Sequence, residues 1–347
     1  MENSAKTRNS RKIDKLLPWI NLVLALLLIS LGIWYLSDKV SLQEIFQALS
    51  LANMRYVFVG IIIVLLTSLL KTWRWQMMLI APNGIPRFSP LFWSTMLGQY
   101  VNIIVPFFRL GDIARIYALN RSTDIPMARA LGTLVLEKVL DLFMLVLTIA
   151  IVLPLIILPD FVAEAGSLLW TVPVISLVVL FLFAYKTELI TRFLLVVQRR
   201  IPIQLAKRVI QWSISGLEGL SALRSKRLSL LLVFSSALIL ILSLLLPYII
   251  LAAFAIPLGI IAAAFIHIVV TIVTTPPSTP GKIGVFNGAA AFALLSLGLE
   301  DEAVMIGYSI IFYLVAVLPL IALGIVAAIK TDWRWQRTSD QQLAMLK

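Results

Sequence analysis

The sequence predicts an all-α polytopic membrane protein with about six full membrane spans and two broken, re-entrant helical hairpins. Hydrophobic residues make up 61% of the 347 positions and charged residues only 13%, whereas soluble domains carry about 25% charged residues. Two apolar stretches are also each interrupted by a polar segment containing proline and glycine. Because broken helices survive at membrane depth only beside protein or a water-filled cavity, the paired breaks indicate an inverted repeat of about eight hydrophobic segments around a transport site.

Composition excludes several classes of function. The chain has no cysteine, which excludes disulfides, thiol nucleophiles and cysteine metal sites, and its single histidine, His267, excludes a histidine-cluster metal centre. We therefore expect no metal and no cofactor. The net charge of +12 on so apolar a chain favours loops that face an anionic membrane surface, and we expect no nucleic-acid partner.

A bilayer core needs roughly 20 apolar helical residues, and this length defines the full spans. They are predicted at 17–36, 55–72, 128–153, 167–185, 229–252 and 303–329. The basic segment 1–16 precedes the first span without a small-residue cleavage site, so we expect an uncleaved anchor and a cytoplasmic N-terminus. The transmembrane domain is then 17–329, and the basic tail 330–347 is expected in the cytoplasm of a prokaryotic cell, below its plasma membrane.

The distribution of arginines predicts how the apolar stretch 88–107 enters the membrane. The preceding span leaves on the cytoplasmic side at Lys71 and Arg74, and four arginines follow the stretch, at Arg109, Arg115, Arg121 and Arg129. A full crossing would leave all four outside, against the positive-inside rule. A hairpin that enters and leaves from the cytoplasmic side removes this conflict.

The segment 258–300 is expected to form a second hairpin, which enters from the outer face. It lies between an uncharged loop around Pro257 and the acidic run 300–302, both expected outside, and its tip is expected at 276–284. Hairpins from opposite faces are typical of inverted-topology repeats, whose substrate site lies between half-helices near the midplane. Limbs of about 15 to 18 residues are also compatible with full spans, so both arrangements stay open.

The segment 186–228 carries nine basic residues against two acidic ones and has apolar positions at helical spacing. It is expected in the cytoplasm, either as interfacial helices on the inner leaflet or as a solvated helical hairpin. A repeat also stands out, because 73–76 and 333–336 both spell Trp-Arg-Trp-Gln after a long apolar helix. We interpret the repeat as convergent anchoring at the membrane interface, which favours tryptophan and arginine.

Charged residues at membrane depth are costly and are candidates for function. Glu137 and Asp141 lie four residues apart on one helix face, and both need cationic partners. We expect Arg109 and Arg115 to face an anionic headgroup, while Glu137, Asp141 and Asp112 hold these arginines or relay a coupling proton. A purely internal salt-bridge network is the alternative.

The second elbow is a candidate phosphate site. Its helix-breaking residues are Pro276, Pro277, Pro280, Gly281 and Gly284, and they match Pro106 and Gly111 in the first elbow. They leave backbone N–H groups free at the start of the limb 285–299, where Lys282 adds a positive charge that favours an anion. Asn287 is a candidate cap or ligand contact, although a core amide is its more ordinary role, and His267 is expected to pack rather than bind.

At these elbows the sequence resembles the flippase-like family that includes the transmembrane region of lysylphosphatidylglycerol synthases. The matching positions are Asn102, Pro106, Arg109, Gly111, Asp112 and Arg115, then Glu137, Lys138 and Asp141, then Pro277, Pro280, Gly281 and Gly284, and also Arg74 and Trp75. The resemblance covers about residues 15 to 335. It departs at Lys282, where a glycine is usual, and at Asn287, where glutamate is common.

The resemblance implies a lipid flippase that carries an anionic, aminoacylated or polyprenyl-phosphate-linked headgroup through a polar cavity lined by Asn102 and the charged residues above. It does not imply aminoacyl transfer, which belongs to a separate soluble domain, so we expect a transporter and not an enzyme. Two alternatives stay open. One is a polyprenyl-phosphate-dependent membrane transferase, and the other is an accessory subunit that docks a lipid-modifying enzyme through 186–228.

Overall fold

The computed structural model describes residue 43 and the ranges 49–79, 84–105, 109–123, 125–156, 226–276 and 279–331. Every regular element of these ranges is helical. The expected spans 17–36 and 167–185, nearly all of the amphipathic segment 186–228 and the second Trp-Arg-Trp-Gln repeat lie outside the described residues, as do Pro106 and Pro277.

Four long helices form the frame of the molecule. They are α3 (Met54–Met78), α6 (Met127–Val152), α11 (Lys226–Ala253) and α14 (Glu302–Lys330), and α6 continues into the short 3₁₀ helix η1 (Leu153–Leu155). Each is long and apolar enough to cross a membrane. The spans predicted at 55–72, 128–153, 229–252 and 303–329 are thereby confirmed, and the all-α polytopic fold with them.

Side-chain caps set where two of these helices begin. The Asn53 side chain accepts the Arg55 N–H at the start of α3, and the Asp301 side chain accepts the Val304 N–H at the start of α14. The Asn53 N–H also donates to the Ala253 carbonyl at 2.8 Å. This bond joins the start of α3 to the end of α11, so the two helices are antiparallel neighbours.

Four shorter helices form the two predicted hairpins. The first pairs α4 (Phe88–Ile104) with α5 (Leu110–Ser122), and the second pairs α12 (Ile260–Thr274) with α13 (Val285–Ser296) through the 3₁₀ turn η3 (Pro280–Lys282). At 12 to 17 residues, the limbs are about 18 to 26 Å long, shorter than a hydrocarbon core of about 30 Å. The chain therefore forms two broken hairpins, whose limbs are shorter than the four long helices.

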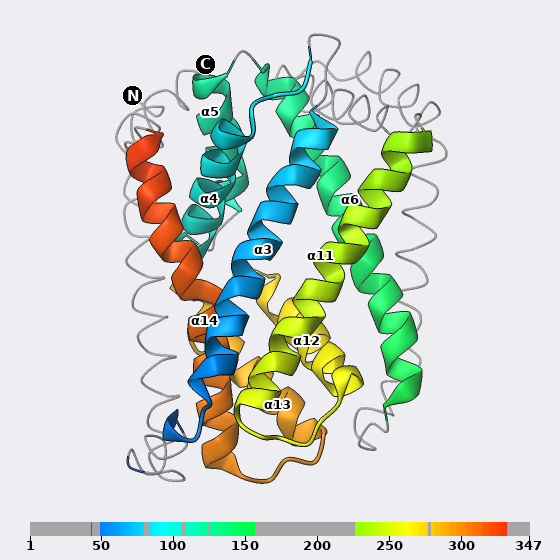
Figure 1. The fold of residues 1–347 in the computed structure, drawn as a ribbon, viewed down its shortest axis with the longest axis vertical. Coiled ribbons are helices and arrows are strands. Elements are labelled where there is room, and N and C mark those ends of the chain that lie inside the picture. The colour runs from blue at the N-terminus through cyan, green and yellow to red at the C-terminus, as the bar shows by residue number, and fades with distance from the viewer. Residues whose placement is uncertain are drawn as a thin grey trace, which may run out of the picture.

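The hairpins lie at opposite ends of the frame, as expected for an inverted repeat (Figure 1). The α4–α5 hairpin shares its end with the last residues of α3 and α14 and the first residues of α6 and α11. The α12–α13 hairpin lies at the other end, where α14 begins and α11 ends. Both tips therefore point toward the middle of the bundle.

Glycines allow the limbs of the first hairpin to approach closely. A Cβ atom on Gly111 would collide with the Gly98 carbonyl oxygen and would lie 2.5 Å from the Asn102 side chain. A Cβ on Gly98 would in turn lie 2.8 Å from the Gly111 carbonyl oxygen. Small residues at such crossings let helices pack through their backbones in a membrane. This contact fixes the start of α5 and with it the position of Arg109.

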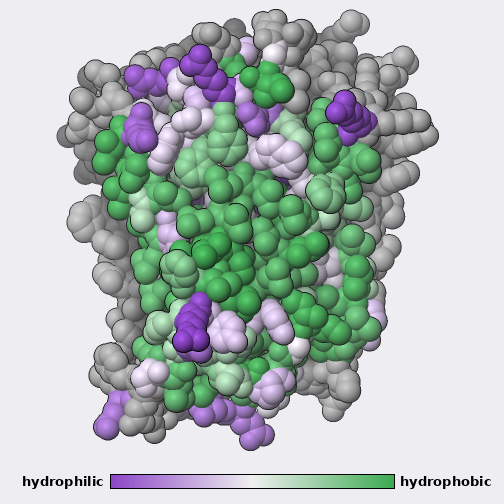
Figure 2. Space-filling model, in the orientation of Figure 1, coloured by the Kyte–Doolittle hydropathy of each residue, from purple (hydrophilic) through white to green (hydrophobic). Residues whose placement is uncertain are grey.

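The outer surface is suited to lipid. Figure 2 shows a broad hydrophobic region over α3 and α11, with hydrophilic residues concentrated toward the two ends. Exposed hydrophobic side chains of these two helices include Phe58, Ile62 and Leu66 of α3 and Leu230 and Phe234 of α11. An apolar surface of this extent is unfavourable in water and favourable in a bilayer.

Candidate functional site

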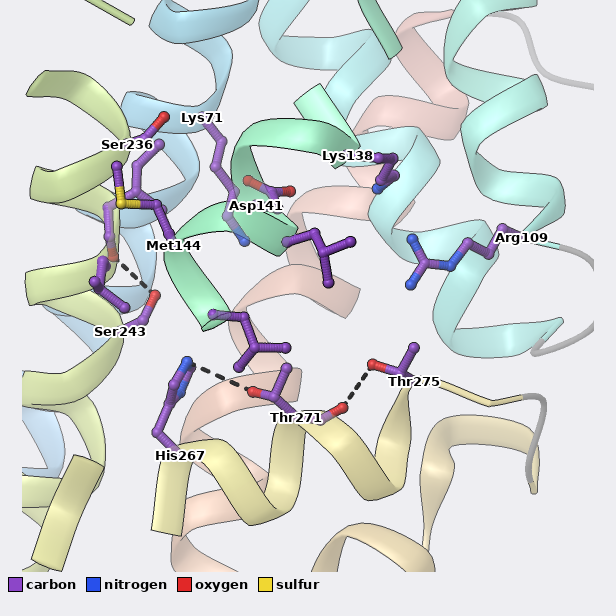
Figure 3. A pocket seen from close by; sticks show the side chains of 14 residues that line it. Lys71, Arg109, Lys138, Asp141, Met144, Ser236, Ser243, His267, Thr271 and Thr275 are labelled. Carbon is purple, nitrogen blue, oxygen red and sulfur yellow. Dashed lines mark hydrogen bonds between the residues drawn. The ribbon is translucent and has the colours of Figure 1, made fainter. Parts of the chain in front are cut away.

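A cavity of about 500 Å³ lies between the two hairpins and the long helices. It is lined by Lys71 of α3, by Arg109 before α5, by Lys138, Asp141, Leu142, Met144 and Leu145 of α6, by Ser236, Ile239, Leu240 and Ser243 of α11, and by His267, Thr271 and Thr275 at α12. Figure 3 shows Lys71 and Asp141 on one side, Arg109 on the other, and His267 with Thr271 from α12. The lining is amphipathic, with charged groups beside leucine and isoleucine.

Asp141 is held by Arg74, a residue that the sequence analysis interpreted as an anchor at the membrane interface. The Arg74 guanidinium lies 2.6 Å from Asp141 Oδ1 and donates to Ser236 Oγ at 2.9 Å. Arg74 is only 1% exposed, whereas the Asp141 side chain is 42% exposed. The pair therefore connects α3, α6 and α11, and its carboxylate is the group that reaches the cavity.

Arg115 and Glu137 form a second, fully internal pair. Arg115 Nη2 lies 2.8 Å from Glu137 Oε2 and Nη1 lies 3.3 Å from Oε1, so the guanidinium binds the carboxylate through two bonds. Its Cζ also lies 3.6 Å from the centroid of the Trp75 ring, whose Nε1 donates to Thr133. Both charged side chains are at most 9% exposed. Arg115 therefore joins α5, α6 and α3 and does not line the cavity.

Asp112 belongs to a third group at the start of α5. Its Oδ2 lies 3.6 Å from Lys138 Nζ, and its Oδ1 accepts from the Asn102 amide at 3.4 Å. The Asn102 side chain also accepts the Gly111 N–H at 2.9 Å. These contacts bind the hairpin limbs to each other and to α6. Asp112 therefore pairs with Lys138, and not with Arg109 or Arg115 as expected from the sequence.

Lys71 and Arg109 are cations of the cavity that take part in none of these three ion pairs. Among the described residues, neither has a carboxylate oxygen within ion-pair distance, although Asp141 lies within electrostatic reach of Lys71. Arg109 also adopts a left-handed backbone conformation, with φ of 49°. That conformation costs roughly 1 to 2 kcal/mol in a residue with a side chain, and such strain is concentrated at functional sites.

The second hairpin reaches the cavity through its first limb. His267 and Thr271 line it, with Thr271 Oγ1 at 3.5 Å from His267 Nε2. Lys282 is outside the lining but, like Arg109, is a basic residue with positive φ at a hairpin tip. Asn287 accepts the Gly284 N–H and donates to the Ser309 carbonyl at 3.0 Å, so its amide caps α13 and ties it to α14.

Backbone conformation explains the glycines of the second tip. Gly281 has φ of 70° and Gly284 has φ of 80°, values that a side chain would strain. The Tyr313 hydroxyl donates to the Gly281 carbonyl at 2.7 Å, which attaches the tip to α14. Pro276 and Pro280 precede these glycines, with Pro280 as the first residue of η3, as the predicted helix break requires.

In the part of the chain that the structure describes, no three His, Cys, Asp or Glu side chains gather in a way that could hold a metal ion.

The sequence matches the family described as "Lysylphosphatidylglycerol synthase TM region" over residues 22–324. This chain belongs to that family. The match covers both hairpins, all of α3, α6 and α11, and most of α14.

Two curated relatives of this member of the lysylphosphatidylglycerol synthase transmembrane family are archaeal. A UPF0104 membrane protein of Methanothermobacter thermautotrophicus is 24% identical over 297 residues, which cover 81% of this chain and 88% of the relative. A UPF0104 membrane protein of Methanocaldococcus jannaschii is 31% identical over 103 residues, which cover 29% of this chain and 31% of the relative. Both relatives are named as membrane proteins, in agreement with the four spans.

In this member of the lysylphosphatidylglycerol synthase transmembrane family, the residues singled out from the sequence divide into two sets. Arg109 and Asp141 meet in the cavity, whereas Asn102, Asp112, Arg115, Glu137 and Asn287 bind other parts of the protein. Lys71, Thr271 and Thr275 were missed, and His267, which was expected to pack, lines the cavity. Lys71 precedes Arg74 by three residues and so shares its helix face, a spacing that could have drawn attention to it.

Proposed function

We propose that this protein moves an anionic lipid across the membrane, with the headgroup passing through the cavity between the hairpins. The observation that carries the proposal is that the amphipathic cavity of about 500 Å³ contains Lys71 and Arg109 without matched carboxylates among the described residues. An unpaired cation at membrane depth is costly, and a bound anion removes that cost.

The cavity also suits the apolar part of a lipid. Leu142, Leu145, Ile239 and Leu240 line it beside the cations. A headgroup would contact the charged side while the first carbons of the acyl or prenyl chain contact α6 and α11. Moving an ionised headgroup through hydrocarbon costs several kcal/mol, and a polar path lowers this barrier. Phospholipids, their aminoacylated forms and polyprenyl-phosphate-linked lipids are the candidate substrates.

The same proposal states how the protein is oriented in the membrane and that it catalyses no reaction. The end of the bundle that holds the α4–α5 hairpin would face the cytoplasm of a prokaryotic cell, since Arg87, Arg121 and Lys330 lie there, and the acidic run 300–302 would lie outside its plasma membrane. The lipid is moved and no bond is made or broken, so we propose a transporter and not an enzyme.

Transbilayer movement in proteoliposomes tests the proposal. Labelled phospholipid and polyprenyl phosphate probes would be followed for the wild type and for Lys71→Gln, Arg109→Gln and Arg121→Gln. Charge-assisted contacts are worth about 1.5 to 3 kcal/mol, so each cavity variant should slow movement about tenfold or more. Arg121, an exposed residue of α5 outside the cavity, is the matched control. Well-folded wild type that moves no probe would refute the proposal.

A further inference from the structure

The charges around the cavity do not balance. The three groups described above, together with Lys71 and Arg109, contain five cations, namely Lys71, Arg74, Arg109, Arg115 and Lys138, and three carboxylates, namely Asp112, Glu137 and Asp141. Three cation–carboxylate pairs form, and two positive charges remain. Among the described residues, no further Asp or Glu lines the cavity.

The remaining charges are not relieved by the second hairpin. The nearest charged side chain that it brings is Lys282, which lies within electrostatic reach of Arg109 and Lys71 and is itself a cation. His267, the titratable residue of α12 at the cavity, also lies in the field of Lys71 and brings no negative charge. The charges that surround the cavity therefore favour binding of an anion with more than one negative charge.

Hydrogen-bonding capacity favours the same ligand. Lys71, Arg109 and Lys138 offer donors and no acceptors, and a phosphate offers acceptors. A ligand ammonium would find one carboxylate in the lining among the described residues, Asp141, whose Oδ1 already accepts from Arg74 at 2.6 Å. A headgroup that adds a positive charge would thus meet three cations and one carboxylate that Arg74 already shares.

We propose that the cavity selects lipids whose headgroup ends in a doubly charged phosphate, as in a phosphate monoester or diphosphate, over singly charged phosphodiesters and over aminoacylated headgroups. This inference rests on the proposed function, since it names the substrate class of the same cavity. Lys71 and Arg109 are its recognition residues, and they lie on opposite sides of the cavity (Figure 3).

Binding to the purified full-length chain in detergent tests this selection without requiring transport. The probes share one tail: dodecyl phosphate, dodecyl phosphoglycerol and its lysyl ester. Dodecyl phosphate should bind about tenfold more tightly than the phosphodiester near pH 8, and the lysyl ester should bind most weakly. Below pH 6 the monoester becomes singly charged, so its advantage should vanish while phosphodiester binding stays level. Equal binding of monoester and diester at pH 8 would overturn the proposal.

Variants assign the selection to the two cations. Lys71→Gln and Arg109→Gln should each lower the monoester preference to near one, and Arg121→Gln should keep it. Arg109→Lys retains the charge and should retain most of the preference, which separates recognition from folding. A preference that survives in both folded glutamine variants would overturn the assignment.

Two further experiments distinguish this inference from recognition of free phosphate and from the proposed transport function. Inorganic phosphate lacks the chain that the leucines of α6 and α11 would contact, so it should compete weakly with dodecyl phosphate. If inorganic phosphate binds as tightly as dodecyl phosphate, the site recognises free phosphate, and the assignment of a lipid ligand is wrong. In proteoliposomes, movement of phosphodiester lipids without monoester lipids would leave the translocator standing and refute the selection. If the protein binds the monoester preferentially but moves no lipid, the selection stands and the proposed transport function is refuted.

Discussion

Replacing Glu137 with glutamine should expose the cost of an unpaired charge inside the bundle. The carboxylate is 9% exposed and binds the Arg115 guanidinium through two bonds of 2.8 and 3.3 Å. Removing one member of a buried pair leaves the other charge uncompensated and costs about 3 to 5 kcal/mol. We expect Glu137→Gln to lower the free energy of unfolding by about 3 to 5 kcal/mol, measured in mixed micelles of lipid and detergent.

A second substitution tests the reasoning. Since a buried pair can be replaced by neutral groups at little net cost, Arg115→Gln combined with Glu137→Gln should recover most of the lost stability. Glu300→Gln, in an exposed loop, is the control and should be neutral. If Glu137→Gln changes stability by less than about 1 kcal/mol, or if the double variant is worse than the single one, the pair is not the structural element described above.

Three further predictions follow from other contacts. Asp141→Asn removes the cavity carboxylate and the partner of Arg74, so binding of dodecyl phosphate should strengthen while thermal stability falls. Gly111→Ala forces a methyl group against the other hairpin limb and should cost about 1 to 3 kcal/mol, whereas Gly288→Ala, with no atom within 4 Å of the added carbon, should be tolerated in the same thermal assay. In this cysteine-free chain, an impermeant thiol reagent should label Arg121→Cys only from the cytoplasmic side and Glu300→Cys only from the outside, and labelling from one common side would reject the topology.

Hydropathy and loop charge were sufficient to predict the four described spans and the two hairpins, because both patterns follow from the bilayer. The predicted span 229–252 corresponds to α11, and the stretch broken at 276–284 becomes the turn between α12 and α13. A hairpin at this place was inferred only from the four arginines after residue 107, and α4 and α5 form a hairpin there.

Side-chain pairing was beyond sequence reasoning because it depends on how helices rotate against one another. Glu137 could equally have met Arg109 or Arg115, and the backbone contact at Gly98 and Gly111 selects Arg115. The anchoring interpretation of the first Trp-Arg-Trp-Gln repeat was wrong for Arg74 and Trp75, which are each 1% exposed. Their burial follows from the pairing with Asp141 and Thr133, which lie far away in sequence.

The length of α3 explains why Lys71 was missed. Its predicted span ended at 72, which placed Lys71 at the membrane surface, but the helix continues to Met78. At 1.5 Å per residue, Lys71 therefore lies about 10 Å inside the end of the helix. That depth turns an ordinary flanking lysine into a cavity residue.

Crosslinking from inside the cavity tests the central claim, that the headgroup passes between the hairpins. A single cysteine at Thr271, which lines the cavity, would be compared with one at Leu295, which is 58% exposed on α13. The reagent is a lipid phosphate monoester that carries a thiol-reactive group on its chain, next to the phosphate. We predict a covalent adduct at Thr271→Cys that excess dodecyl phosphate suppresses, and little adduct at Leu295→Cys. Adducts at Leu295→Cys alone, or adducts at Thr271→Cys that excess dodecyl phosphate leaves unchanged, would contradict the account.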